Sequence, residues 1–182
     1  MDLFHPLRDF RRRRQLAKLD ALATHLQLVE LRRDCARGNF VFPGPDIAAS
    51  IERAGQRVGV IHYGLSPLDD RVYISDFRIA RDQQGQGLGL ATLWRLWQQH
   101  QVPLTPLHEV GSSLGFWAKA RQRLAAAGVE LTQDIRTAEQ DGEQQRWQHL
   151  VPEPEHERLI RELMASPEWP AIKARFDAEY NA

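Results

Sequence analysis

Residues 84–89 read Gln-Gly-Gln-Gly-Leu-Gly, and a run of this composition can bind an anion through its backbone. An apolar stretch, residues 72–79, precedes the run, and a stretch with helical periodicity, residues 86–100, follows it. The predicted order is therefore strand, glycine-rich turn and helix. Since the first N–H groups of a helix have no intrahelical acceptor, a pyrophosphate can bind there.

Two other phosphate-binding patterns are excluded by the residue types. A P-loop requires Gly-x-x-x-x-Gly-Lys-Ser/Thr, and residues 80–100 contain no lysine. The dinucleotide fingerprint requires Gly-x-Gly-x-x-Gly, and its third glycine falls on Leu90 when the pattern starts at Gly85. Started at Gly87, the pattern places Thr92 there. A tight strand-to-helix turn that merely uses glycine is the remaining alternative.

The spacing Gln84-x-x-Gly87-x-Gly89 resembles the pyrophosphate loop of the GNAT superfamily, the acyl-CoA-dependent N-acyltransferases. The signature of that family is Gln/Arg-x-x-Gly-x-Gly/Ala. The resemblance implies an enzyme that transfers an acetyl group from acetyl-CoA to a primary amine, without a metal. It also implies that the loop backbone holds the pyrophosphate and that the edge of the preceding strand holds the pantetheine arm. The implied cofactor-binding residues are Phe77, Arg78, Ile79, Gln84, Gly85, Gln86, Gly87, Leu88 and Gly89.

The general base is less clearly marked by the sequence. Acyl transfer needs a positioned thioester, a stabilised carbonyl oxygen and a deprotonated amine. In the best-known branch of the superfamily a glutamate precedes the Gln/Arg position on the motif strand, and Tyr73 stands at that place here. A phenol ionises at about pH 10 and is a poor base. The other candidates are His62 on the neighbouring strand, Asp76 if a strand bulge turns it inward, and Glu109 after the next strand.

The general acid of the family has no counterpart either. Many relatives carry a tyrosine four residues before a Gly-Phe pair, and this tyrosine protonates the leaving thiolate. Gly128 and Val129 stand for that pair, which places Leu124 at the tyrosine position. Tyr63, Tyr73 or a water is left to protonate the thiolate, or the thiolate leaves unaided. These departures favour the alternative function, a GNAT-like CoA-binding or interaction module without efficient catalysis.

Three short strands are predicted before the turn, at residues 47–52, 57–65 and 72–79, and they form a meander. After the turn helix, Pro103 and Pro106 bracket a short extended segment, and prolines keep such a segment at an edge or near a bulge. In GNAT proteins the strand at this place splays from the motif strand, and the pantetheine arm lies in the gap.

The remaining segments are predicted from periodicity and turn signals. Apolar residues at spacings of three and four indicate one helix over residues 6–37, and another is predicted over about residues 112–127. The last predicted elements are strands at 129–136 and 144–151 and helices at 155–165 and from Ser166 to about Tyr180.

This order of elements matches the GNAT core, so the expected fold is α/β (α+β), a mixed and mostly antiparallel sheet flanked by helices. The expected organisation is a single domain over residues 1–182. Within it, the GNAT-like core covers residues 45–151, with helical extensions at residues 1–38 and 152–182.

Composition limits the class of partner. The 24 basic and 24 acidic residues give a formal net charge of zero, so no global field points to nucleic acid. The single cysteine excludes a disulfide framework and a cysteine-rich zinc site. Without a long apolar run or a signal-peptide core, the expected location is the cytoplasm, with no membrane partner.

One basic run, Arg11–Arg14, departs from this balance. A solvated helix face is the simpler interpretation, with contact to RNA, DNA or acidic lipid as the alternative. The expected partners are therefore acetyl-CoA and an amine-bearing acceptor, and the chain could also form a homodimer. The fold alone does not identify the acceptor.

Overall fold

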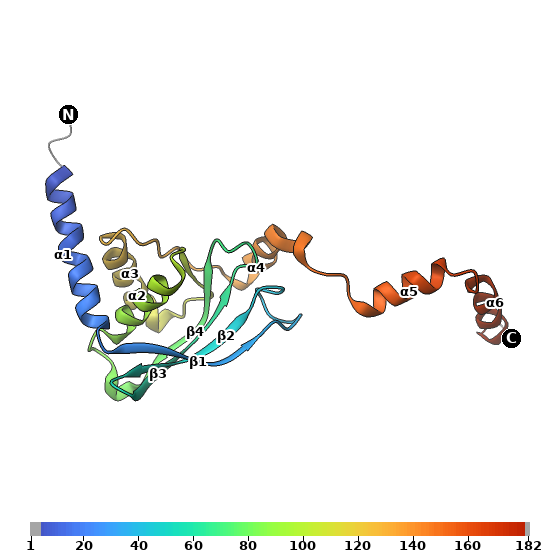
Figure 1. Cartoon of the computed structure of the whole chain (residues 1–182), viewed down its shortest axis with the longest axis horizontal. Coiled ribbons are helices and arrows are strands. Elements are labelled where there is room, and N and C mark those ends of the chain that lie inside the picture. The colour runs from blue at the N-terminus through green and yellow to red at the C-terminus, as the bar shows by residue number, and fades with distance from the viewer. Residues whose placement is uncertain (1–4, 181–182) are drawn as a thin grey trace. The chain divides into compact units, whose positions relative to one another are not determined.

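The computed structural model describes residues 5–180 of the chain (Figure 1). The described residues form an α+β fold in which helices flank a five-stranded, mostly antiparallel sheet, so the predicted fold class is confirmed. The chain divides into two compact units, residues 1–150 and 151–182. Residues 1–4 and 181–182, which belong to the predicted terminal extensions, lie outside the described part.

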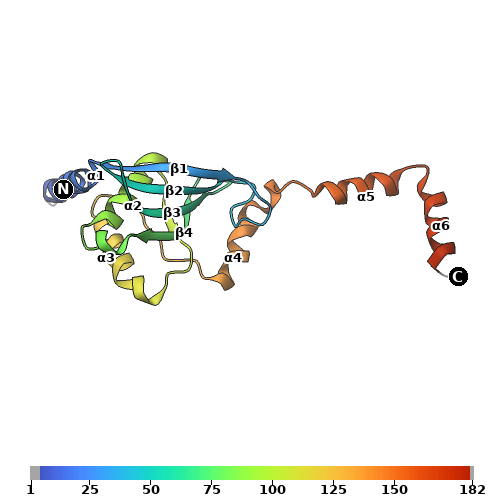
Figure 2. The same ribbon diagram turned by 90° about the horizontal axis from the view of Figure 1, so that it is seen from below.

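The sheet has the strand order β1-β2-β3-β4-β5, so that the first four strands form an antiparallel meander (Figure 2). The predicted meander strands are confirmed to within a residue or so at each end, and one strand precedes them. The strands are β1 (Leu26–Asp34), β2 (Asp46–Arg53), β3 (Gln56–Leu65), β4 (Val72–Ile79) and β5 (Leu104–Pro106).

Strand β5 runs parallel to β4 along only part of its length. The paired residues of β4 end at Ile74, and the last backbone link is the Leu107 N–H, which donates to the Ile74 carbonyl at 2.8 Å. On the β5 side, the edge of β4 from Ser75 to Ile79 has no strand partner among the described residues. The proline-bracketed segment is therefore an edge strand, as predicted, and it separates from β4 after Ile74.

A bulge interrupts β4 at the same point. Tyr63 of β3 pairs with Ile74, whereas the neighbouring His62 pairs with Asp76, so Ser75 is an extra residue. An extra residue shifts the alternation of side chains along the strand. Phe77 and Ile79 therefore face the core, although they are an odd number of residues from Ile74.

One face of the sheet carries the main hydrophobic core. Buried side chains of α1 (His5–Ala23), α2 (Leu88–His100) and α3 (Leu114–Ala125) belong to the same cluster as the inward residues of the sheet. Leu93 of α2 and Leu124 of α3 are fully buried there. The buried residues of α2 include the run 91–94, so the helix is buried around more of its circumference than one narrow stripe.

A second, smaller cluster covers part of the opposite face. The ring of Tyr73 lies 5.0 Å from Phe40 and 5.7 Å from Trp147, measured between ring centroids. Trp147 belongs to the 3-10 helix Gln145–Leu150, which follows α4 (Thr137–Gln144). Its indole N–H donates to the Phe42 carbonyl at 3.1 Å. Helix α4 thereby lies near the beginning of β4, apart from α2 and α3 (Figure 1).

The prediction of one helix over residues 6–37 is wrong beyond Ala23. The helical spacing of apolar residues continues to Val29, but Leu26 and Leu28 also stand two residues apart, which suits one face of a strand. The chain forms β1 there, and this strand pairs with β2 along its length. The sheet therefore begins inside the segment predicted as a helical extension.

The two final strands predicted at 129–136 and 144–151 are also wrong. The first segment makes only isolated parallel bridges beside β5, between Leu104 and Leu131 and between Leu107 and Ile135. The second segment contributes the end of α4 and the 3-10 helix. In the first segment, the alternating apolar residues correctly indicated extended backbone. Residues 137–144 contain almost no apolar residue, so no spacing could indicate that a helix begins there.

The second unit consists of two helices, α5 (Glu155–Ala165) and α6 (Trp169–Tyr180). The predicted helix at residues 155–165 is confirmed. Among the described residues, no helix is both long and apolar enough to cross a bilayer.

Candidate active site

The glycine turn joins β4 to α2, as predicted. Gly87 is the N-cap of α2 with φ +77°, and Gly85 has φ +78°; both lie in the left-handed region that favours glycine. Residues 84–87 are exposed, whereas Leu88 is buried and fixes the start of α2 to the core.

The three glycines of the turn meet different surroundings. A Cβ added at Gly85 would meet no atom within 4 Å, whereas one at Gly87 would lie 3.2 Å from the Leu22 side chain. A Cβ at Gly89 would lie 2.7 Å from the ring of Phe116. Gly89 therefore serves the contact of α2 with α3, and Gly85 alone borders open space in which a ligand could lie.

The backbone amides of residues 85–90 have no acceptor among the described residues. The first paired amide is that of Ala91, which donates to the Gly87 carbonyl at 3.0 Å. A helix N-terminus with free amides and a positive dipole end attracts negative charge. The turn therefore presents a set of donors suited to an anion such as a pyrophosphate.

Two polar side chains border this turn. The Gln84 amide donates to the Ile79 carbonyl at 3.0 Å, so it ties the turn to the end of β4. The Arg53 guanidinium donates to Oε1 of Gln86 at 2.9 Å. Sequence reasoning missed Arg53; the meander was a usable signal, because it places the end of β2 at the same end of the sheet as the end of β4.

Beside the free edge of β4, an aromatic side chain of the strand packs against two aromatic side chains of α3. The ring centroid of Phe77 lies 5.7 Å from that of Phe116 and 6.1 Å from that of Trp117, both on α3. Arg78 is exposed and forms an ion pair with Asp76 at 2.7 Å. Of the residues expected to hold pantetheine, Phe77 and Ile79 thus face the core, and Arg78 faces the other side.

The sequence candidates His62, Tyr73 and Asp76 share the sheet face opposite the main core. His62 and Asp76 are paired across β3 and β4, and Tyr73 pairs with Gly64 on the same face. His62 is half-buried. The structure therefore brings these three candidates to one face.

Tyr73 is fixed in a polar network rather than free for chemistry. Its hydroxyl donates to Oε1 of Glu143 at 2.5 Å and accepts from Arg146 at 3.2 Å. Burial, together with the adjacent Glu143 carboxylate, raises the pKa of the Tyr73 phenol far above its usual value. The phenol is therefore a hydrogen-bond donor at neutral pH and cannot be the base.

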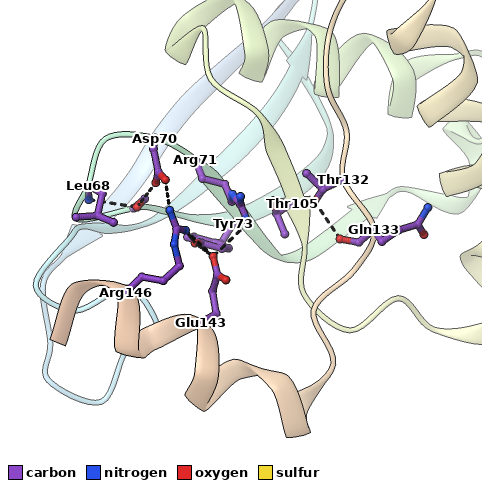
Figure 3. A network of polar contacts seen from close by, with 10 residues as sticks. Leu68, Asp70, Arg71, Tyr73, Thr105, Thr132, Gln133, Glu143 and Arg146 are labelled. Atoms are coloured by element: carbon purple, nitrogen blue, oxygen red, sulfur yellow. Dashed lines mark hydrogen bonds and ion pairs between the residues drawn. The ribbon is translucent and has the colours of Figure 1, made fainter.

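The network continues through charged groups (Figure 3). Glu143 also accepts from Arg71 at 3.2 Å and from Arg146 at 2.6 Å, and Arg146 reaches Asp70. Burial acts to raise the pKa of Glu143, but the hydrogen bonds from Tyr73 and Arg146 outweigh it and leave that pKa below its usual value. Sequence reasoning missed this network because residues 144–151 were predicted as a strand.

Glu109 lies in a separate set of contacts. Its side chain is buried and forms an ion pair with Arg121 of α3. Its backbone N–H donates to the Asp134 carboxylate at 3.1 Å, and Arg121 also donates to the Thr132 carbonyl at 2.9 Å. These contacts fix the segment after β5, and none of them joins Glu109 to the candidates on β3 and β4.

Leu124, at the position of the family's general acid, is fully buried in the main core. No tyrosine replaces it on α3.

A comparison of the chain with protein-family models finds no match, and a comparison with curated proteins finds none either.

Proposed function

We propose that the chain is an N-acetyltransferase of the GNAT type, which transfers an acetyl group from acetyl-CoA to a primary amine. One combination of features carries the proposal. An exposed glycine turn with free amides opens α2, and only the short 3-10 helix Arg81–Gln83 separates it from a strand whose edge is left unpaired after Ile74.

Each part of acetyl-CoA has a matching feature. The pyrophosphate would bind the amides of residues 85–90, with the Arg53 cation beside it to supply the charge that Gln84 lacks. The pantetheine amides would pair with the free edge of β4, in the manner of an added strand. The thioester would then lie where β4 and β5 separate, near Ile74 and Leu107.

In the reaction, the neutral amine nitrogen attacks the thioester carbonyl, the C–S bond breaks, and the proton of the amine passes to a base. His62 and Asp76 are the candidates on the appropriate face, acting directly or through a water. Asp76 and Glu109 are both paired with an arginine, but Glu109 is the weaker candidate because its pair with Arg121 is buried, whereas Asp76 stays partly exposed. The CoA thiolate is stable enough to leave without a tyrosine, since an ordinary thiol has a pKa of about 8.5.

A binding module without efficient catalysis is the second candidate function. It is favoured by the observation that both usual catalytic positions hold residues committed to structure, Tyr73 in a hydrogen-bonded network and Leu124 in the core.

Two measurements separate these functions. Acetyl-CoA should raise the melting temperature under either one, because a ligand that binds the folded state stabilises it. Release of free CoA thiol in the presence of a small primary amine should occur only for the enzyme. We expect thiol release in the wild type and its loss in His62→Gln or Asp76→Asn, with the thermal shift kept. A thermal shift without thiol release from any amine would support the binding module.

A further inference from the structure

A cavity of about 440 Å³ lies beside Glu143, the hydrogen-bond partner of Tyr73. It is lined by Arg71 before β4, by the extended segment 132–135 and by the α4 carboxylates Glu139 and Glu143. Figure 3 shows Arg71, Thr132 and Glu143 entering this region from three separate segments. Its volume is within the usual range for small-molecule sites, about 300–1,000 Å³.

The cavity borders the place where β4 and β5 separate. Thr105 of β5 pairs with Tyr73 and shares a 2.9 Å hydroxyl hydrogen bond with Thr132 of the cavity wall. One step along, the Ile135 N–H donates to the Pro106 carbonyl at 3.1 Å. The next residue, Leu107, donates its N–H to the Ile74 carbonyl, which is the last backbone hydrogen bond between β5 and β4. A ligand in the cavity would therefore lie beside the proposed thioester position.

The lining leaves one carboxylate without a cation. Glu143 is paired with Arg71 at 3.2 Å, and Asp134 is paired with Arg136 at 2.7 Å. Glu139 accepts only the backbone N–H of Arg136, at 2.9 Å, and has no cationic partner among the residues that the structure describes. The cavity therefore offers a negative charge to a ligand, while its one lining arginine is already paired.

We infer that this cavity takes the acceptor, and that the acceptor is a small amine with a second positively charged group. The inference rests on the proposed acetyl transfer. The reacting nitrogen must be neutral when it attacks, so it gains nothing from a carboxylate at that moment. A second ammonium group stays charged throughout, and Glu139 can hold it. An acceptor with a carboxylate in that place would be repelled by Glu139.

Binding can be measured without relying on catalysis. Calorimetric titration of the full chain with 1,4-diaminobutane, n-butylamine and 5-aminopentanoate compares acceptors of similar length that differ in the second charged group. We expect the diamine to bind about fivefold more tightly than butylamine, the size of an exposed ion pair, and the aminopentanoate to bind more weakly than either.

Variants locate the effect. Glu139→Gln should abolish the preference for the diamine without disturbing α4, because a glutamine oxygen still accepts the Arg136 N–H. Glu130→Gln, an exposed carboxylate outside the cavity, is the matched control and should leave the preference intact. Equal binding of the two amines, no binding of either, or a preference that survives Glu139→Gln would overturn the inference.

Different results would contradict the proposed function and this inference. A chain that binds acetyl-CoA and acetylates both amines equally keeps the function and loses this inference. A chain that binds the diamine through Glu139 but shows no acetyl-CoA thermal shift keeps the cavity assignment and loses the function.

Discussion

Tyr73 stands where a carboxylate base is expected on β4, and its surroundings make it a donor instead. Glu143 brings a carboxylate to the same place from α4, but Arg71 and Arg146 neutralise it. The Glu143 carboxylate therefore holds Tyr73 and the two arginines together, and these contacts keep the carboxylate ionised. The type of a residue at a family position does not establish its role until its partners are known.

Tyr73→Phe should lower stability and leave acetyl transfer nearly unchanged. The change removes a hydrogen bond to a charged group, which typically contributes about 1.5 kcal/mol. Urea denaturation would measure the loss, and thiol release would measure transfer. Tyr63→Phe, at a buried tyrosine on the core face, is the comparison variant. If Tyr73→Phe abolished transfer with full stability, the phenol would have to take part in the proton transfer.

His100 gives stability a dependence on pH. Its ring packs on Tyr63 with centroids 5.6 Å apart, and its Nε2 is buried without a partner among the described residues. Burial, assisted by the charge of Arg33, lowers the pKa of His100 below its ordinary value of 6.5. The unfolded chain therefore binds more protons than the folded one below about pH 6.5, so stability falls as the pH falls through that window.

His100→Phe should remove this part of the acid sensitivity, because phenylalanine fills the site without a proton to gain. The free energy of unfolding would be measured for the wild type and variant at about pH 7.5 and about pH 5.5. The wild type should lose more stability than the variant between these values. An equal loss in both would show that His100 titrates alike in the folded and unfolded chain.

At the scale of elements, the turn between β4 and α2 was predictable because its signals are local. A strand pattern, glycines at fixed spacing and a helical stripe follow one another in residues 72–100, and together they predict the order strand, turn and helix. β1 and α4 were not predictable in this way. Leu26 fits the helical spacing that runs to Val29 and also the strand spacing shared with Leu28, and pairing with β2 decides between them. Helix α4 has few apolar residues and is held by polar contacts of Glu143 and Gln144.

Site residues could be predicted from the sequence only where the strand or turn that carries them was also predicted. The sequence located the turn and placed His62 and Asp76 on adjoining strands. Arg53 and Glu143 could not be found, because their contacts join segments 33 and 70 positions apart in the sequence. Such contacts depend on the register of the whole sheet and not on a local pattern.

Arg53 leads to a prediction for the end of β2. Arg53→Gln should weaken acetyl-CoA binding by about 1 kcal/mol at low salt, because a cation beside the turn is lost. The loss should shrink as salt is added, since exposed charges are screened. Arg57→Gln, an exposed arginine on β3, should have a smaller effect. Equal effects of the two variants would mean that only the general charge of this region matters.

At the scale of the molecule, the proposed chemistry belongs to the first unit. The main core and every candidate site residue lie within residues 1–150, whereas α5 exposes the apolar side chains Leu159, Ile160, Leu163 and Met164. A chain that ends at Leu150 should therefore keep its melting temperature to within a few degrees and keep the thermal shift with acetyl-CoA. Loss of that shift would assign residues 151–182 to the CoA site.

The central claim is that the glycine turn binds acetyl-CoA, and a matched pair of variants tests it directly. Gly85 and Gly55 both have φ +78°, and a Cβ at either would meet no atom within 4 Å. Alanine at either position should thus cost the same backbone strain, about 1–2 kcal/mol. Only Gly85 lies in the turn, where its Cβ would enter the space assigned to the pyrophosphate.

The measurement is a calorimetric titration of the wild type, Gly85→Ala and Gly55→Ala with acetyl-CoA at a temperature where all three are folded. The wild type and Gly55→Ala should bind one acetyl-CoA with similar affinity, and Gly85→Ala should bind at least about tenfold more weakly, a loss of about 1.4 kcal/mol. Absence of binding to the wild type up to about 1 mM, or equal binding by Gly85→Ala, would contradict the account.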